Sequence, residues 1–151
     1  MKWVVAIWRW LSFWPGLQRF ILSLWHPKFL IGVVAVITDG EGRVLLFHHT
    51  YRRKFVWSLP GGWMQRGEEP AETVVREIKE ETDLDIEVDR LYEVVTGVVA
   101  PSFEVIYLAH VVGGEFRPSV EVDEINWCRA DRLPDLKDYQ HHIITSVLAA
   151  E

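Results

Sequence analysis

Three glutamates near the middle of the chain, Glu77, Glu80 and Glu81, have the type and spacing of metal-binding side chains. Positions i, i+3 and i+4 lie on one face of an α-helix, so the three carboxylates would project together. Like charges at this spacing destabilise a helix by about 0.2–0.5 kcal/mol per pair, so something should compensate. Carboxylate oxygens at this density suit a hard divalent cation, Mg²⁺ or Mn²⁺. The alternative is a solvated acidic face with Lys79 as partner.

The residues beside these glutamates fit a site for a charged ligand. Arg76 precedes Glu77 directly and lies four residues before Glu80, so its guanidinium can hold a carboxylate through two hydrogen bonds. Gly61 and Gly62 lack a Cβ, which allows the backbone to approach a ligand closely. The pattern therefore predicts an arginine that orients carboxylates next to a glycine-lined approach.

The stretch from Gly62 to Leu84 resembles the Nudix box, Gx5Ex7REUxEExGU, in which U is a bulky aliphatic residue. Every fixed position matches except Asp83, where the family has glycine. The family glycine lies where a helix ends, a place that often needs positive φ, and Asp tolerates this conformation better than most residues. We therefore expect a small cost in stability and an intact site. The resemblance extends more weakly over residues 31–149.

The resemblance implies a fold, an activity and a set of roles. The fold is a Nudix-type α/β/α sandwich with a mixed β-sheet. The activity is metal-dependent hydrolysis of a pyrophosphate bond in a nucleoside diphosphate linked to another group, X. The implied metal ligands are Glu77, Glu80, Glu81 and the carbonyl of Gly61, and Glu68 would lie nearby as a supporting ligand or a hydrogen-bond partner. Arg76 would orient the glutamates.

A general base must take a proton from the attacking water. In the family the base is either a box glutamate or a glutamate of a later loop. Glu121 and Glu124 are the later candidates, and the spacing from Glu121 to Trp127 resembles the family pattern. We therefore favour Glu121 as a catalytic residue, and an ordinary exposed loop glutamate is the alternative.

Substrate-binding residues are less clearly marked. Arg52 and Arg53, in a basic loop before the box, have guanidinium groups that fit phosphate in a forked geometry; a solvated loop is the alternative. Phe103 is a candidate wall for a nucleobase, and a core position is the alternative. The candidates for the substrate are ADP-ribose or another nucleotide sugar, a (d)NTP and a CDP-alcohol. A non-catalytic module that senses a nucleotide is the second function considered.

The elements around the box must position these side chains. Ile31–Thr38 and Arg43–Phe47 are apolar stretches joined by a turn-forming Asp-Gly-Glu-Gly, which predicts a β-hairpin. Pro70 fits the start of a helix over Ala71–Thr82. The remaining expected elements are strands Val56–Leu59, Ile86–Val99, Phe103–Val112 and Ile125–Cys128, and a helix Leu133–Ala150. Strands and helices mixed in this order predict a mixed sheet covered by helices.

Residues 1–30 differ in composition from residues 31–151, the expected Nudix domain. They hold five of the eight tryptophans, four basic residues and no Asp or Glu. Apolar residues recur at helical spacing, which predicts an extension of two short helices. The alternatives for the role of this segment are packing on the domain or formation of a homodimer, contact with a membrane surface, and targeting. The segment is too short and too interrupted by Arg9 and Pro15 for a membrane span.

Composition narrows the classes of protein. The chain has 151 residues, of which 49% are hydrophobic and 25% charged, values typical of one globular domain. A single cysteine excludes an internal disulfide framework and a cysteine-rich zinc site. Residues 31–151 hold 12 basic and all 22 acidic residues, against a net charge of −6 for the whole chain. This balance argues against binding to duplex nucleic acid. We expect a cytoplasmic homodimer that acts on a small nucleotide, with possible peripheral contact of residues 1–30 with a membrane.

Overall fold

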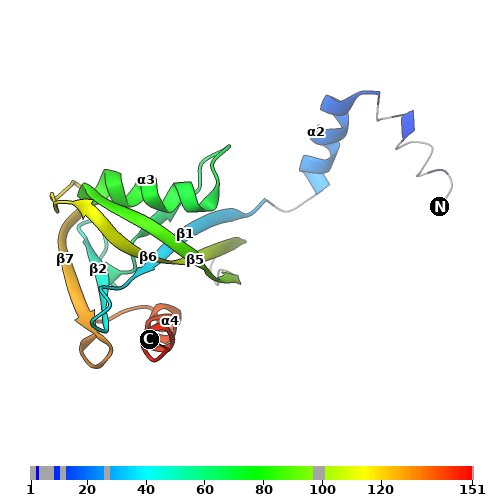
Figure 1. Cartoon of the computed structure of the whole chain (residues 1–151). Helices are drawn as coiled ribbons and strands as arrows, with labels where there is room; N and C mark the ends of the chain where they lie inside the picture. Colours follow the sequence, from blue (N-terminus) through cyan, green and yellow to red (C-terminus); the bar gives the residue numbers. More distant parts are fainter. Residues whose placement is uncertain (1–2, 4–8, 11–12, 26–27, 97–100, 151) are drawn as a thin grey trace.

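The computed structural model describes residues 3, 9–10, 13–25, 28–96 and 101–150. A four-stranded mixed sheet has the order β4-β1-β6-β5, and a three-stranded antiparallel sheet has the order β3-β2-β7. Helices lie on the two faces of this β-layer (Figure 1), which confirms the α/β/α sandwich with a mixed sheet. The strands are β1 (Leu30–Ile37), β2 (Arg43–His49), β3 (Trp57–Ser58), β4 (Gly61–Trp63), β5 (Leu84–Thr96), β6 (Ser102–Gly114) and β7 (Val122–Arg129).

Alternate residues of the central strands build two separate cores. In β1, Val33 and Ala35 pack on the side that also holds Val74 and Ile78 of helix α3 (Pro70–Thr82). Val36 packs on the opposite side, with the apolar residues of helix α4 (Asp138–Leu148). A strand with both faces covered must be apolar throughout, which explains the unbroken apolar run of β1.

Helix α3 is bounded by specific terminal contacts. Glu69 and Glu72 form a capping box at its start, and Pro70 occupies the first turn, where its missing N–H has no partner to lose. The helix ends at Asp83, whose φ of 62° lies in the left-handed region. This confirms the conformation expected at the position where the family has glycine.

Two expectations from the sequence are wrong. The predicted hairpin does not form: β1 is paired by β4 on one edge and by β6 on the other, so no edge is left for β2. The turn between β1 and β2 holds the isolated bridge between Thr38 and Val44 and a hydrogen bond from the N–H of Asp39 to the carbonyl of Arg43, and the two strands belong to different sheets. The last helix begins at Asp138 rather than Leu133, because Pro134 disfavours the helical conformation of the residue before it. The chain forms a short 3₁₀ turn, η1 (Ala130–Arg132), before that point.

Of the two helices expected in residues 1–30, the second is present as α2 (Pro15–Trp25). The first falls mostly on residues outside the described part of the chain. Figure 1 shows α2 apart from the sandwich, and several of its large apolar side chains are exposed. Among the helices described, none is long and apolar enough to cross a membrane.

Candidate functional site

Strand β4 and helix α3 meet at the centre of the predicted site. Gly62 lies opposite Val33 in the pairing of β4 with β1, and a Cβ added to Gly62 would lie 2.2 Å from Cδ of Glu77. Gly61 has a φ of 152°, and a Cβ there would lie 2.1 Å from the carbonyl oxygen of Val33. The two glycines therefore let β4 pass directly beneath a box glutamate while it pairs with β1.

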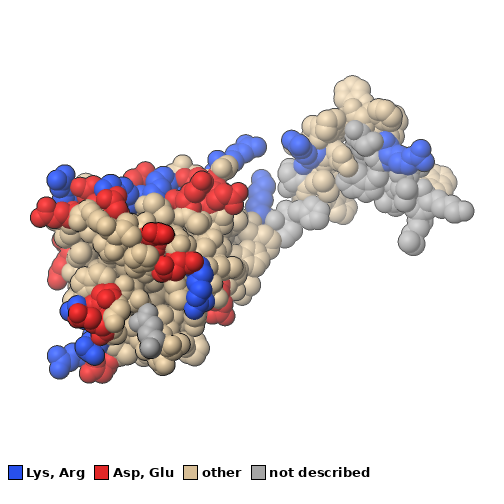
Figure 2. Space-filling model, viewed as in Figure 1, with Lys and Arg blue, Asp and Glu red and all other residues tan. Residues whose placement is uncertain are grey.

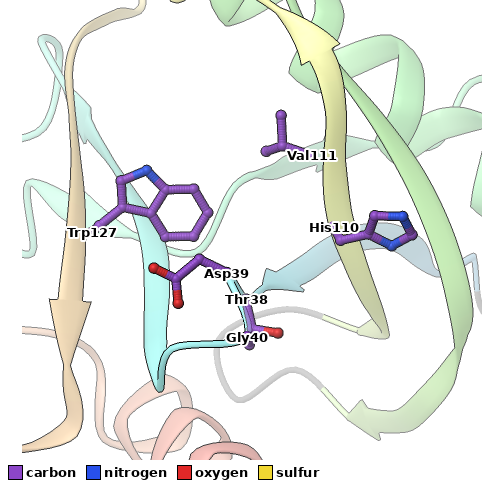
Figure 3. A pocket seen from close by; sticks show the side chains of 6 residues that line it. All are labelled: Thr38, Asp39, Gly40, His110, Val111 and Trp127. Carbon is purple, nitrogen blue, oxygen red and sulfur yellow. The ribbon is translucent and has the colours of Figure 1, made fainter.

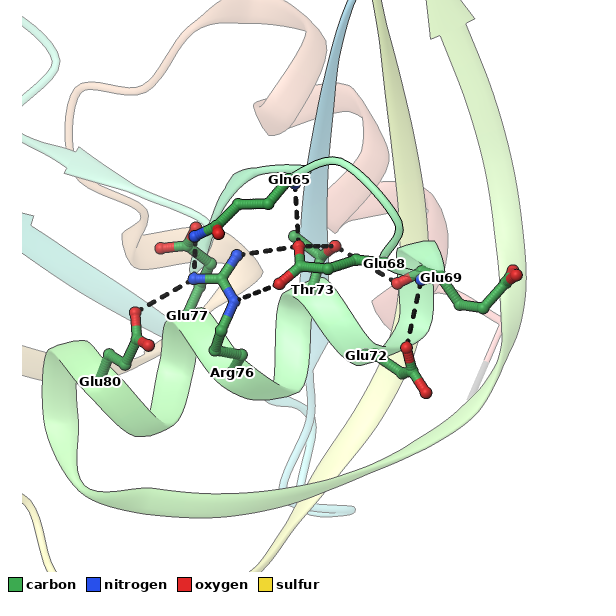
Figure 4. Close-up of polar contacts among 8 residues, drawn as sticks. All are labelled: Gln65, Glu68, Glu69, Glu72, Thr73, Arg76, Glu77 and Glu80. Atoms are coloured by element: carbon green, nitrogen blue, oxygen red, sulfur yellow. Dashed lines mark hydrogen bonds and ion pairs between the residues drawn. The ribbon is translucent and has the colours of Figure 1, made fainter.

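Arg76 holds Glu68 in a two-pronged ion pair (Figure 4). Its Nε donates to Oε1 at 2.6 Å, and its Nη2 donates to Oε2 at 3.1 Å. Its Nη1 lies 3.0 Å from Oε1 of Glu77 and 3.1 Å from Oε2 of Glu80. One guanidinium thus connects three box glutamates, with its forked side toward Glu68.

Glu68 is further fixed by two contacts that the sequence did not indicate. Its Oε2 accepts hydrogen bonds from the backbone N–H of Gln65 and from the hydroxyl of Thr73, both at 2.9 Å. The hydrogen bonds from Arg76, followed by that from Gln65, lower the pKa of Glu68 to about 2. Thr73 is fully buried on α3, five residues after Glu68. Both oxygens of Glu68 are therefore occupied in this structure by protein donors.

Lys79 does not neutralise the acidic face of α3. Its Nζ lies 2.9 Å from carboxylate oxygens of both Asp83 and Asp85, and it donates to the carbonyl of Asp83 at 3.0 Å. These contacts lie at the end of the helix. The alternative of a solvated acidic face paired with Lys79 is therefore not supported, because Lys79 pairs with Asp83 and Asp85. Arg76 is instead in contact with Glu77 and Glu80.

Glu81 has the most unusual environment of the box glutamates. It is only 9% exposed, and among the described atoms its buried Oε2 has no hydrogen-bond partner. Burial, followed by the nearby carboxylates of Glu77 and Glu121, raises its pKa to about 7. A buried carboxylate oxygen without a donor, beside further carboxylates, fits a cation ligand. Within the described part of the chain, no three acidic, histidine or cysteine side chains are gathered closely enough to hold a metal as they stand.

The later loop and the basic loop both approach Glu81. Glu121 raises the pKa of Glu81, whereas the positive charge of Arg52 opposes that rise. The backbone N–H of Thr50 donates to the carbonyl of Glu121 at 3.0 Å, which joins the two loops. Arg53 is exposed, and Phe103 packs against Phe29 with ring centroids 4.9 Å apart. The electrostatic effects on Glu81 thus come from Arg52 and Glu121, whereas the described ring contact of Phe103 is with Phe29.

A pocket of about 490 Å³ lies elsewhere in the domain (Figure 3). It is lined by Thr38, Asp39, Gly40, His110, Val111 and Trp127. Asp39 accepts hydrogen bonds from the backbone N–H groups of Glu41 and Arg43. Nδ1 of His110 lies 2.9 Å from Oδ1 of Asp89. None of the predicted site residues lines this pocket, so we do not assign it to the carboxylate site.

Comparison with known proteins gives consistent matches. A family model described as the NUDIX domain matches residues 28–147. An ADP-ribose pyrophosphatase of Methanocaldococcus jannaschii is 32% identical over 124 residues, 80% of this chain and 72% of that protein. A NAD-capped RNA hydrolase of Vibrio atlanticus is 25% identical over 76% of this chain; the chain spans only 42% of that relative. The crystal structure of an ADP-ribose pyrophosphatase from Streptococcus suis matches with a TM-score of 0.67 and 27% identity, covering 80% of this chain and 92% of that one.

Proposed function

The chain belongs to the NUDIX family, and from this premise we propose that it hydrolyses a pyrophosphate bond in a nucleoside diphosphate derivative, with Mg²⁺ or Mn²⁺ as cofactor. The observation that carries the proposal is the Glu81 carboxylate, which is buried with one oxygen unpaired among the described residues and has Glu77 and Glu121 beside it. A charged carboxylate buried in this way is costly unless it binds a proton or a cation compensates it. The atoms proposed to bind the metal are all oxygens, which favours Mg²⁺ or Mn²⁺ over softer metals.

We assign holding of the cation to Glu81, Glu77 and Glu80. Arg76 contacts both Glu77 and Glu80 through the single nitrogen Nη1, so these carboxylates can turn toward a cation while the two-pronged pair with Glu68 keeps the guanidinium in place. When bound, the cation neutralises the pyrophosphate charge and lowers the pKa of a bound water. Ligand roles for Glu68 and for the carbonyl of Gly61 stay predictions, and the occupied oxygens of Glu68 favour a positioning role through Arg76.

Two residues outside the box complete the proposed site. We assign to Glu121 the role of accepting the proton of the attacking water, and the support for this role is that its negative charge raises the pKa of Glu81. Arg52 lies near the same carboxylates and presents a permanent positive charge to a substrate phosphate. The roles predicted for Arg53 and Phe103 stay predictions, as does the homodimer.

ADP-ribose is the first substrate to test. The relative from M. jannaschii and the neighbouring structure from S. suis both carry the name ADP-ribose pyrophosphatase. The name NAD-capped RNA hydrolase adds NAD, which also contains an adenosine pyrophosphate, to the substrates to test. Nucleotide sugars, (d)NTPs and CDP-alcohols remain in the panel because the box recognises the pyrophosphate and not the group X.

The deciding experiment is product release from this panel with Mg²⁺, Mn²⁺ or EDTA. We expect cleavage of one class that EDTA abolishes. Glu81→Gln should remove turnover and leave the fold intact by circular dichroism. Glu87→Gln is the matched control, because Glu87 is an exposed glutamate of β5 away from the box.

Two results would contradict the proposal. Full activity of Glu81→Gln would show that the metal assignment is wrong. Binding of Mg²⁺ by calorimetry without cleavage of any substrate would instead favour a module that senses nucleotides.

A further inference from the structure

Helix α2 presents a one-sided apolar surface. Leu17, Phe20 and Leu24 are spaced three and four residues apart and therefore lie along the same side of the helix. They are 44%, 60% and 68% exposed. Arg19 is exposed on the other side. The aromatic side chains that precede and end the helix, Trp14 and Trp25, are exposed as well.

The edge of the domain that follows α2 is also apolar. Phe29, Leu30, Ile31 and Trp63, which we call the apolar edge, are between 36% and 56% exposed. Trp63 belongs to this edge because it lies opposite Gly32 in the pairing of β4 with β1. Exposed apolar residues are ordinary when scattered, but an apolar helix face and an apolar domain edge that follow each other in the chain are typical of a site of interaction.

The charge of residues 1–30 indicates which class of partner fits α2 and the apolar edge. Residues 1–30 contain no Asp or Glu, and the acidic side chains visible in Figure 2 lie on the sandwich. Basic residues beside exposed tryptophan and leucine favour an anionic lipid surface, where aromatic rings lie at the level of the headgroups. The acidic residues of the sandwich are repelled by such a surface, so α2 and the uncharged apolar edge are the parts of the molecule that face the lipid.

Pairing of two α2 helices fits this surface less well. It would bring together two copies of residues 1–30, which each carry four basic residues and no acidic residue. Pairing of α2 with the apolar edge of another copy would cover two apolar surfaces. The oligomeric state of the variants below distinguishes that arrangement from binding to lipid.

We propose that α2 and the apolar edge bind the surface of an anionic phospholipid bilayer, with α2 lying in the plane of the headgroups. Binding would place the end of β4 that carries Trp63 against the lipid. Gly62, which lies beneath Glu77, is the adjacent residue of that strand. The carboxylate site would thus lie close to the membrane surface. This inference rests on α2 and the apolar edge and does not depend on the catalytic assignment.

Sedimentation of the full chain with vesicles tests the proposal. Vesicles of phosphatidylcholine alone are compared with vesicles containing about one-third phosphatidylglycerol. We expect binding to the anionic vesicles, weak binding to the neutral ones, and a loss of binding when NaCl is raised from about 0.1 M to about 0.5 M.

Two double variants separate insertion of the apolar face from attraction by charge. Leu17→Glu with Leu24→Glu should lower the partition coefficient at least about tenfold beyond the control, because two leucines no longer leave water. The control is Gly16→Glu with Gln18→Glu, which changes the charge equally; a Cβ on Gly16 meets nothing within 4 Å. Glu81→Gln should bind vesicles like the wild type, so failure of catalysis and failure of membrane binding are distinguishable.

Three results would overturn the proposal. The first is no sedimentation with anionic vesicles. The second is an equal loss of binding in the two double variants, which would leave no role for the apolar face. The third is a wild-type dimer that Leu17→Glu with Leu24→Glu converts to a monomer without any effect of lipid, which would make α2 an interface between copies.

Discussion

The backbone of Gly62 lies directly against the carboxylate of Glu77. A Cβ on Gly62 would lie 2.2 Å from Cδ of Glu77 and 2.6 Å from each of its oxygens. Strand β4 cannot easily retreat, because Gly62 is also paired with Val33 of β1. Any side chain at position 62 must therefore move Glu77, and this relationship leads to the first prediction.

Gly62→Ala should lower kcat/KM by about 100-fold, because a displacement of about 1 Å in a catalytic group is enough for a loss of this size. The melting temperature should change little if Glu77 moves and the backbone stays. Gly113→Ala is the matched control, since its Cβ would lie 3.5 Å from the nearest atom, an ordinary contact. Steady-state kinetics with the best substrate of the panel provide the measurement, and an unchanged kcat/KM in Gly62→Ala would exclude a catalytic role for Glu77 in this position.

Arg76→Lys should lower kcat about tenfold or more although it keeps the charge. A lysine ammonium cannot reproduce the two parallel hydrogen bonds to Glu68 together with contacts to Glu77 and Glu80. The control is Arg66→Lys, at an exposed position of the preceding loop. Full kcat in Arg76→Lys would mean that the fork geometry is irrelevant and that only the positive charge matters.

The sequence predicted the chemistry of the site better than its internal contacts. Spacing predicted that Glu77, Glu80 and Glu81 share one face of a helix and that Arg76 can hold a carboxylate. In α3 Arg76 does contact Glu77 and Glu80. The contact between Gly62 and Glu77 joins two elements, and no local pattern encodes it. Thr73 was missed for the same reason, since its hydroxyl acts on Glu68 across the start of the helix.

For the fold, too, the sequence predicted local features better than contacts between elements. Apolar stretches located most strands, but the hairpin prediction failed because pairing depends on which strands compete for the edges of β1. β4 was missed because Gly61 and Gly62 have low strand propensity, and its pairing with β1 overrides that preference. Local sequence therefore predicted the elements, whereas their partners depended on tertiary packing.

His49 should make the stability of the protein depend on pH. It is 1% exposed, and its Nε2 lies 2.8 Å from the hydroxyl of Ser58. Burial, followed by the positive charges of Arg52 and His48, lowers its pKa from 6.5 to about 4. The unfolded chain therefore binds a proton between pH 6.5 and 4 that the folded chain does not, so the stability present above pH 6.5 is lost as the pH falls toward 4.

Urea unfolding of the wild type and His49→Gln tests this effect. Between pH 7.5 and 4.5 the wild type should lose about 2 kcal/mol more than the variant. His142→Gln, at an exposed position of α4, should keep the wild-type slope. An identical pH dependence in His49→Gln and the wild type would show that His49 does not stay neutral in the folded protein.

Asp83 offers a test of the one departure from the box. Its φ of 62° is unfavourable for a residue with a Cβ, and Asp and Asn tolerate this region better than Ala. Replacing Asp83 also removes its ion pairs with Lys79 and Arg117, at 2.9 Å and 3.3 Å. Asp83→Gly and Asp83→Ala lack these pairs equally, so a comparison of those two isolates the backbone conformation; Asn keeps an amide oxygen that can accept a hydrogen bond from Lys79. Asp83→Ala should melt about 3 °C below Asp83→Asn, and Asp83→Gly should melt at or above the Asn variant.

Scanning calorimetry measures this order of melting temperatures, and equal melting temperatures would mean that the helix end relaxes out of the left-handed region. All three variants should keep wild-type kcat, because none of them alters Glu77, Glu80, Glu81 or the pair between Arg76 and Glu68.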